Sequence, residues 1–447
     1  MFHSITPHEE QDMLKTIGVS SFEDLLGDVP SAVRVKGLLN VPPPQSELEL
    51  RRRLKTLADR NINADTAACF LGAGAYDHSI PSVVPALASR SEFATSYTPY
   101  QAERSQGLLQ TIYEFQSMIC GLTGHEVANA SLYDGASALA EAALTAMRIT
   151  KRDQIVVSGT IHPHYRSVLN TYLTSVGKIV EIPHANGVTN LEGLKGVIDE
   201  STAAVMLQYP NFYGCLEDLS AAFQLAHEHQ SLAVVSADPI ALGLLKPPSE
   251  SGADITIGEG QGLGNPLSYG GPYVGFFATR KEYVRQIPGR LVGRTVDTQG
   301  RRGFCLTLQT REQHIRRDRA TSNICTNQAL IALRTTIYLA VMGKHGLRAV
   351  AEQCVKKAHY AHQQLCAIPG VAPAFPHAFF KEFVVKLPCS PAIINEQLTR
   401  VGIIGGLDLG TYDSSLTNHM MISVTEKRTR DDIDRLVDTI AGCVKNA

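Results

Sequence analysis

The chain has 447 residues, and 41 Lys and Arg against 43 Asp and Glu give it a formal net charge of −2. With 44% hydrophobic and 19% charged residues, its composition is that of a folded globular protein and excludes a disordered chain. The near-neutral charge argues against nucleic acid or a membrane surface as a partner bound by bulk charge.

The compartment is predicted from what the sequence lacks. The first residues show neither a basic nor an apolar signal region, and no apolar run approaches the roughly 18 residues of a membrane span. Nine scattered cysteines without a CxxC pair favour reduced thiols over disulfides or zinc ligands. A soluble, cytoplasmic protein is therefore expected.

The N-terminal part is expected to form an arm with helices. The first forty residues are acidic and amphipathic, and Pro42, Pro43 and Pro44 stop any helix because proline lacks the amide hydrogen. A charged helix is predicted over residues 45–61. The YTPYQ segment, Tyr97 to Gln101, is expected to be extended or turned, since a residue before proline avoids the α region.

Residues 105–280 alternate between helical periodicity and short β-branched runs, which predicts a mostly parallel sheet covered on both faces. The helices are expected over 105–122, 135–150, 164–175, 190–199 and 216–230, and the strands over 155–157, 178–182, 203–207, 232–238, 254–258 and 273–279.

A second, smaller α/β unit is predicted at the C-terminus. Residues 285–325 are rich in arginine and show no clear periodicity. Beyond them, helices are expected over 326–342, 346–367, 391–400 and 430–445, and strands over 383–387 and 420–424. The predicted division is an N-terminal arm with helices (1–69), a large α/β domain (70–325) and a small domain with its connecting helix (326–447).

Common nucleotide and metal motifs are absent. The glycines of GEGQGLG at 258–264 recur at every second position and do not form GxGxxG, and no GxxxxGK occurs. The pairs His162/His164 and His227/His229 have no partner cluster with the spacing of a metal site, so solvated or core histidines are expected, and no metal.

Three features favour a ligand site. Asp134, Gly135 and Ser137 open an Ala-rich helix whose free N–H groups suit an anion such as phosphate, although an ordinary capped helix would look the same. Asp238 ends an apolar strand, where it could face a heterocyclic nitrogen cation or simply cap a turn. The Gly- and Pro-rich segment 258–278 predicts an irregular functional loop.

The order of these features resembles that of pyridoxal-phosphate enzymes of fold type I, the aspartate-aminotransferase fold, whose large domain has a mostly parallel sheet of the seven-stranded type. Such an enzyme needs a lysine after the Asp and near the loop to hold the cofactor as a Schiff base. Between Lys246 and Lys281 there is no lysine.

Longer motifs resemble the glycine cleavage system P-protein, glycine decarboxylase, and within that family its lysine-less half, the α subunit or subunit 1. They are FLGAGAYDH (70–78), YTPYQAERSQGLLQTIYEFQ (97–116), SLYDGASALAEA (131–142) and the 258–278 loop. In the active half a lysine precedes one proline by five residues and another by eleven. Here Gln261 precedes Pro266 and Pro272 in this way, so Gln261 stands at the Schiff-base position.

The resemblance implies a division of labour between two chains. The lone pair of an amide nitrogen is delocalised, so Gln261 cannot hold pyridoxal phosphate covalently and no catalytic residue is expected on this chain alone. The cofactor would be held by a lysine-bearing β subunit, which decarboxylates glycine and passes the aminomethyl group to the lipoyl arm of the H-protein. Asp134, Ser137, Asp238 and Gln261 would then form a vestigial site.

Two segments are candidates for completing the partner's site. Tyr97, Tyr100 and Gln101 could line a substrate or lipoyl channel, although aromatic residues beside proline often serve packing. Thr321, Ser322 and Asn323 could donate hydrogen bonds to the phosphate of the partner's cofactor. Eight arginines could guide an acidic carrier or form an ion-pair face; they are Arg290, Arg294, Arg301, Arg302, Arg311, Arg316, Arg317 and Arg319.

Two alternatives stay open. The chain could be a self-sufficient enzyme that uses another lysine or bound pyridoxamine phosphate, or a non-catalytic scaffold or regulatory homologue. The sequence also leaves open whether one αβ pair or two, a heterotetramer, form the assembly.

Overall fold

The computed structural model describes residues 4–95 and 97–445 and divides into two compact units, Met1–Ile62 and Asn63–Ala447. In the first unit, α1 (Pro7–Ile17) and α2 (Glu47–Ala58) each begin with a capping box, Thr6 with Glu9 and Ser46 with Glu49. No described residue of this unit is buried. Its helices therefore depend on their caps and not on a core of their own. The domain boundaries expected at residues 69 and 325 stay predictions.

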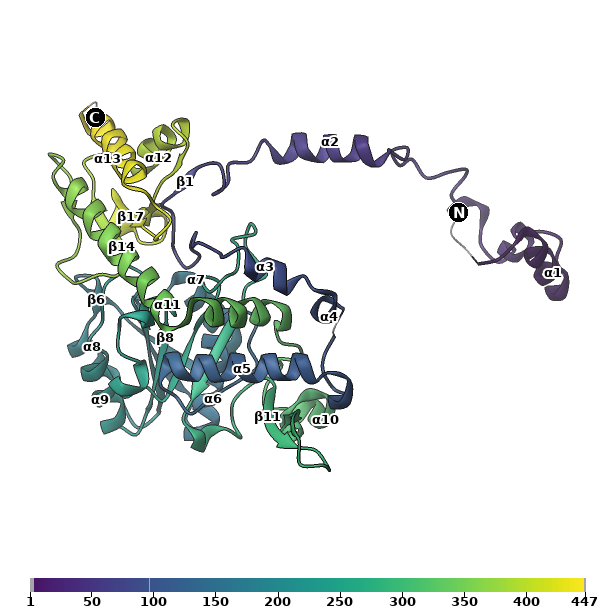
Figure 1. Ribbon diagram of the computed structural model, residues 1–447, viewed down its shortest axis with the longest axis horizontal. Coiled ribbons are helices and arrows are strands. Elements are labelled where there is room, and N and C mark those ends of the chain that lie inside the picture. Colours follow the sequence, from purple (N-terminus) through teal and green to yellow (C-terminus); the bar gives the residue numbers. More distant parts are fainter. Residues whose placement is uncertain (1–3, 96, 446–447) are drawn as a thin grey trace. The chain divides into compact units, whose positions relative to one another are not determined.

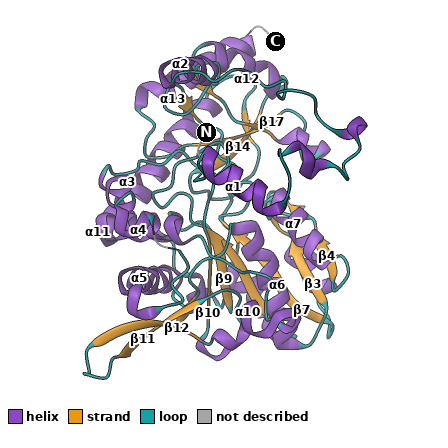
Figure 2. Ribbon diagram, turned by 90° about the vertical axis from the view of Figure 1, so that its right-hand side faces the viewer, coloured by secondary structure: helices purple, strands orange, loops and turns teal. Residues whose placement is uncertain are grey.

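The second unit is built around a seven-stranded sheet with the order β2-β10-β9-β8-β7-β3-β4 (Figures 1 and 2). Strands β3, β4, β7, β8 and β9 are parallel, whereas β10 runs antiparallel between β9 and β2. The bounds are β2 Val127–Ala128, β3 Gln154–Ser158, β4 Lys178–Ile182, β7 Thr202–Tyr209, β8 Leu232–Ala237, β9 Ile255–Glu259 and β10 Gly275–Thr279. The predicted doubly covered, mostly parallel sheet is confirmed.

Alternating side chains of the strands supply two cores. Ile155 and Val157 of β3 pack with α6 (Gly135–Thr150) and α7 (Pro163–Leu173), while Val156 packs on the opposite face with α8 (Leu191–Val197) and α9 (Leu219–Glu228). This is the period of two that strands impose on their side chains. Helix α5 (Gln106–Thr123) contacts α11 (Ala329–Cys366), as Figure 1 shows, and α11 is broken at Gly343.

The C-terminal part contains an antiparallel sheet with the order β13-β14-β17-β16. Helices α12 and α13 pack on each other beside this sheet, and β1 pairs with β15. The bounds are β1 Ala68–Cys69, β13 Ala372–Pro373, β14 Glu382–Lys386, α12 Pro391–Arg400, β15 Ile403–Ile404, β16 Leu407–Asp408, β17 His419–Ser423 and α13 Arg430–Lys445. The predicted small α/β unit is thus present.

The arginine-rich stretch contains a hairpin, so the expectation of no periodicity was wrong. Strands β11 (Leu291–Val296) and β12 (Arg302–Thr307) pair along their whole length (Figure 2). Phe304 and Leu306 of β12 are buried at every second position, which is the alternation of a half-buried strand. The remaining short elements are α3 (Val83–Ala88), α4 (Ser91–Ala94), α10 (Gln313–Arg316), β5 (His184–Ala185) and β6 (Val188–Thr189).

Within the described residues, none of the helices has the length and apolar character needed to cross a bilayer.

Gly275 of β10 allows the backbone at Asp134, just before α6, to pack directly against this strand. A Cβ atom at Gly275 would lie 2.2 Å from the backbone oxygen of Asp134. Replacement of Gly275 by alanine is therefore expected to lower the free energy of unfolding by about 2–3 kcal/mol in a urea titration. Gly121, on the exposed side of α5 with open space around it, serves as the control, and its alanine variant should gain up to about 1 kcal/mol. Equal stabilities of the two variants would contradict this packing.

Candidate functional site

A cavity lies where the parallel strands of the large sheet end. Asp238 follows β8, Glu259 is the last residue of β9, and Gln261 begins the loop after it. Lys381 and Glu382, at the start of β14, reach the same cavity from the small sheet. Ligands gather at the carboxyl ends of the strands in open α/β sheets, so this is the candidate site.

Asp238 is paired with a lysine of the chain. The Lys381 ammonium lies 2.7 Å from Asp238 Oδ2 and 3.4 Å from the centroid of the Tyr76 ring, and Lys381 is only 2% exposed. The second oxygen, Oδ1, accepts a hydrogen bond from the amide of Ile240. Burial opposes ionisation of Asp238, but the Lys381 charge outweighs it and lowers the pKa of this carboxyl.

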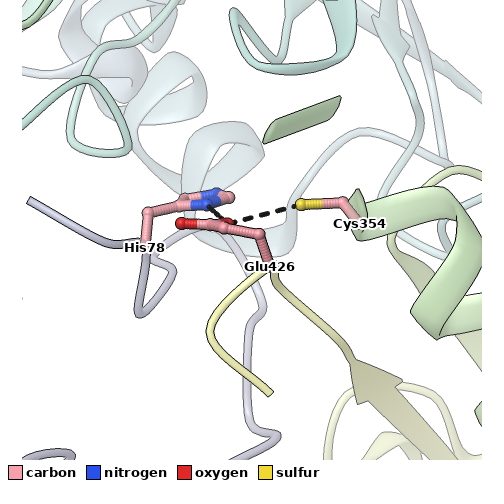
Figure 3. Close-up of side chains that lie close together, drawn as sticks. All are labelled: His78, Cys354 and Glu426. Atoms are coloured by element: carbon pink, nitrogen blue, oxygen red, sulfur yellow. Dashed lines mark hydrogen bonds and ion pairs between the residues drawn. The ribbon is translucent and has the colours of Figure 1, made fainter. Parts of the chain in front are cut away.

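The buried charges continue beyond Lys381 to a group of three side chains, His78, Cys354 and Glu426 (Figure 3). His78 Nε2 lies 3.1 Å from the Lys381 ammonium, and its Nδ1 lies 2.6 Å from Glu426 Oε2, to which the Cys354 thiol donates at 3.5 Å. Burial works against ionisation of Glu426, but the hydrogen bond and charge of His78 lower its pKa to about 2. With an ammonium beside the ring and both ring nitrogens engaged, this cluster is an ion-pair chain and gives no support for a cation site.

The N-terminus of α6 is covered by the chain itself. Asp134 caps the helix by accepting from Ser137 N at 2.7 Å, and Gly135 N donates to Glu259 Oε2 at 3.0 Å. Glu259 Oε1 also accepts from the amides of Gln261 and Val274. Asp134, Gly135 and Ser137 thus begin the helix as expected, and carboxyl groups of the same chain accept from two of its N–H groups.

Burial raises the pKa of Glu259 to about 8, although three backbone amides donate to it. The unfolded chain loses this proton near the ordinary value of 4.5 and the folded chain near 8, so stability falls as the pH rises between these values. Between pH 5 and pH 8, the free energy of unfolding of the Glu259→Gln variant, measured by urea titration, should fall less steeply than that of the wild type. The two slopes should differ by at most about 1.4 kcal/mol per pH unit. The same substitution at exposed Glu103 should leave the wild-type slope unchanged, and a Glu259→Gln slope equal to the wild type would contradict the burial argument.

Gln261 is fixed by the backbone around it. Its Oε1 accepts from Tyr76 N at 2.8 Å, and its Nε2 donates to the oxygens of Tyr76 and Asn265 at 3.0 and 2.8 Å. The side chain is only 1% exposed, and both hydrogens of its Nε2 are already donated to backbone oxygens.

Glu382 joins the small sheet to the same segment. It accepts from Ala73 N at 2.7 Å and from the Tyr76 hydroxyl at 2.8 Å. Burial raises the pKa of Glu382 to about 7, against the effect of the Ala73 amide and Lys381. Among the described residues that line the cavity, the carboxyl groups are those of Asp238, Glu259 and Glu382, and the ammonium is that of Lys381.

A second polar cluster is formed around Tyr100. Arg290, which is 3% exposed, donates to the Tyr100 hydroxyl at 2.9 Å and forms an ion pair with Glu312 at 3.4 Å. The ring of His314 meets that of Tyr100 edge-on, with the centroids 5.5 Å apart. Tyr100 is nevertheless 51% exposed, so the buried arginine holds an aromatic side chain at the surface.

The other predicted contact residues lie near this cluster or at the surface. Tyr97 is 79% exposed, and Gln101 is exposed too. Thr321 N donates to Arg311 O, Ser322 Oγ accepts from Ile324 N, and Asn323 Oδ1 accepts from Gln313. None of Tyr97, Tyr100, Gln101, Thr321, Ser322 and Asn323 is among the described residues that line the cavity.

The structure thus brings Asp238 and Gln261 into one cavity and keeps the two candidate contact segments apart from it. Of the eight arginines, Arg290 and Arg311 are buried, so they cannot present charge to a carrier. Arg290 is paired with Glu312, and Arg311 donates to the backbone oxygens of Ile287 and Gly289.

The residues of these clusters that the sequence analysis missed include Glu259, Arg290 as a holder of Tyr100, Lys381 and Glu382. A sequence signal existed only for Glu259, a charged residue between glycines directly after a buried strand. Lys381 and Glu382 stand just before the predicted strand 383–387, and nothing in the sequence relates them to Asp238.

Comparisons with known structures define the class first. The chain aligns with a sphingosine-1-phosphate lyase of Burkholderia pseudomallei at a TM-score of 0.63 and 15% identity, covering 94% of this chain and 95% of that one, which shows the fold alone. The fold is that of pyridoxal-phosphate enzymes of fold type I, as predicted.

The family follows from closer matches. The model of the family described as glycine cleavage system P-protein matches residues 2–440. A protein of Desulforamulus reducens named probable glycine dehydrogenase (decarboxylating) subunit 1 is 54% identical over 96% of this chain and 97% of its own. A crystal structure of glycine decarboxylase (P-protein), in inhibitor-bound form, aligns at a TM-score of 0.89 and 44% identity over 99% of each chain.

The chain belongs to the glycine cleavage system P-protein family, and the resemblance to its subunit 1 type is confirmed. A similar protein of Carboxydothermus hydrogenoformans, 52% identical over 98% of both chains, has the same name. That name implies that those proteins work with a second subunit, and the fold points to pyridoxal phosphate as the cofactor.

Proposed function

We propose that the chain is the α subunit of a heteromeric glycine decarboxylase, the aminomethyl-transferring glycine dehydrogenase of the glycine cleavage system. Together with a lysine-bearing β subunit it decarboxylates glycine and transfers the aminomethyl group to the lipoylated H-protein. What supports this proposal is the glutamine at position 261, which the sequence resemblance sets at the Schiff-base position, in a chain that matches the P-protein family over residues 2–440. A family member without the lysine needs a partner that has it.

Pyridoxal phosphate, held covalently by the β subunit, supplies the electron sink for the loss of carbon dioxide. The residues of this chain bind and orient the substrate, the lipoyl arm and the partner's cofactor. Tyr97, Tyr100 and Gln101 line the path of the substrate or the lipoyl arm, and the Arg290 guanidinium fixes the direction of the Tyr100 hydroxyl. Their exposure and the buried support beneath Tyr100 favour a contact with another chain.

Thr321, Ser322 and Asn323 reach the phosphate of the partner's cofactor in this proposal. The Arg311 and Ile324 hydrogen bonds hold this loop in shape ahead of α11. In this proposal the α and β subunits act in the cytoplasm. A reducing compartment suits the nine cysteines of this chain, which are all free thiols.

Co-expression with a candidate β chain, followed by an assay of glycine-dependent carbon dioxide exchange with lipoylated H-protein, tests the proposal. Exchange is expected from the complex and from neither chain alone. Exchange by this chain alone would favour a self-sufficient enzyme, and a stable complex whose activity does not depend on this chain would favour a scaffold.

A further inference from the structure

We propose that this chain fills its own cofactor site: Glu259 takes the place of the phosphate, Lys381 that of the ring nitrogen cation, and Gln261 that of the covalent link. The site would then exclude pyridoxal phosphate altogether, beyond the loss of the covalent bond. The choice of this cofactor rests on the proposed function, whereas the filling of the site is read from contacts within this chain.

At the phosphate end, two backbone donors already have acceptors within the chain, and the space is restricted. Gly135 N donates to Glu259 and Ser137 N to Asp134. The Tyr165 hydroxyl lies over the same turn, so close that a Cβ atom added to Gly135 would be 2.2 Å from it. A phosphate would have to displace a carboxyl group that accepts three backbone hydrogen bonds, and whenever Glu259 is ionised its charge would repel the dianion.

At the ring end, both oxygens of Asp238 already have a partner within the chain. Oδ2 pairs with Lys381 at 2.7 Å, and Oδ1 accepts from Ile240 N. The Lys381 ammonium is in addition held against the Tyr76 ring at 3.4 Å, a cation–π contact in a buried setting. A cationic ring would meet a fixed cation at the position it needs.

At the position of the covalent link, the side chain of Gln261 is also hydrogen-bonded within the chain. Gln261 makes a reciprocal pair of hydrogen bonds with the backbone of Tyr76, the residue whose ring covers Lys381. The three replacements therefore share neighbours, and a lysine at position 261 would arrive in a cavity whose other two ends stay closed.

The test uses the full-length chain with pyridoxal phosphate and borohydride reduction, read by mass spectrometry of the peptide containing position 261. The forms compared are the wild type, Q261K, E259A/Q261K and E259A/Q261K/K381M. Exposed Lys386, on the same strand as Glu382, reports unspecific labelling in each sample. Cofactor retained after ultrafiltration is measured in parallel, so that binding without a covalent bond is also seen.

The wild type and Q261K are expected to retain no cofactor and to show no labelling at position 261 above that of Lys386. The triple variant should be labelled at least tenfold more at position 261 than Q261K. Retention by the wild type, or equal labelling of Q261K and the triple variant with its circular dichroism spectrum intact, would overturn the inference.

If the triple variant does not fold, E259A/Q261K decides the case, because it keeps the Lys381–Asp238 pair. E259A/Q261K should already be labelled more strongly at position 261 than Q261K. Equal labelling of these two variants would overturn the inference. These outcomes do not depend on a β subunit, so they are distinguishable from a failure of the carbon dioxide exchange assay.

Discussion

Replacement of Lys381 by methionine is expected to lower the free energy of unfolding by about 3–5 kcal/mol, measured by urea titration at pH 7. The substitution keeps most of the side-chain volume but removes the cation that faces the Asp238 carboxyl, 15% exposed, at 2.7 Å. It also removes the ammonium beside His78 and the Tyr76 ring. The loss follows because a largely desolvated carboxylate is then left without its cation.

Two further variants separate charge from packing. Lys386→Met, on the same strand but exposed, should stay within about 0.5 kcal/mol of the wild type. Asp238→Asn combined with Lys381→Met should recover much of the loss, since neither side chain is then charged. A loss as large in the double variant as in Lys381→Met would show that packing, and not the ion pair, is responsible.

The second large effect is expected at Arg290. Its replacement by methionine leaves Glu312 buried without its cation, which should cost about 3 kcal/mol of stability. It also removes the donor to the Tyr100 hydroxyl, so the assembled αβ enzyme should lose at least about tenfold in glycine-dependent exchange, as misplacement of a positioning group does.

The matched control is Arg294→Met, at an exposed position of β11, which should change neither quantity appreciably. Tyr100→Phe isolates the hydroxyl: it should reduce exchange while leaving the free energy of unfolding within about 1 kcal/mol of the wild type. If Arg290→Met lost stability but kept full activity in the complex, Tyr100 would have no role in the shared site.

Much of the fold could be predicted because local signals and burial agree. The helices expected over 135–150, 391–400 and 430–445 have these bounds in the structure, since signals such as the N-cap Asp134 and the first-turn proline Pro391 mark where helices begin. The β11–β12 hairpin was missed because its burial pattern is irregular. In β11 the first two residues are buried and the last three are exposed, and in β12 the exposed Arg302 stands on the same face as Phe304 and Leu306.

The candidate site was predictable only where its residues share one stretch of chain with a recognisable order. Asp134, Asp238 and Gln261 follow that order. Lys381 pairs with Asp238 across a separation of 143 positions, and such a contact depends on how the small sheet packs on the large one. No periodicity or spacing within a sequence contains this information.

The self-filled cavity also bears on how such a chain could change over evolutionary time. Glu259, Gln261 and Lys381 contact one another's neighbours, so reversing any one of them alone leaves a buried charge or donor without its partner. A return to an independent enzyme would require several coordinated substitutions, with destabilised intermediates on the way. A chain whose cavity is filled in this manner therefore stays dependent on a partner, because each single reversal lowers its stability before any activity is regained.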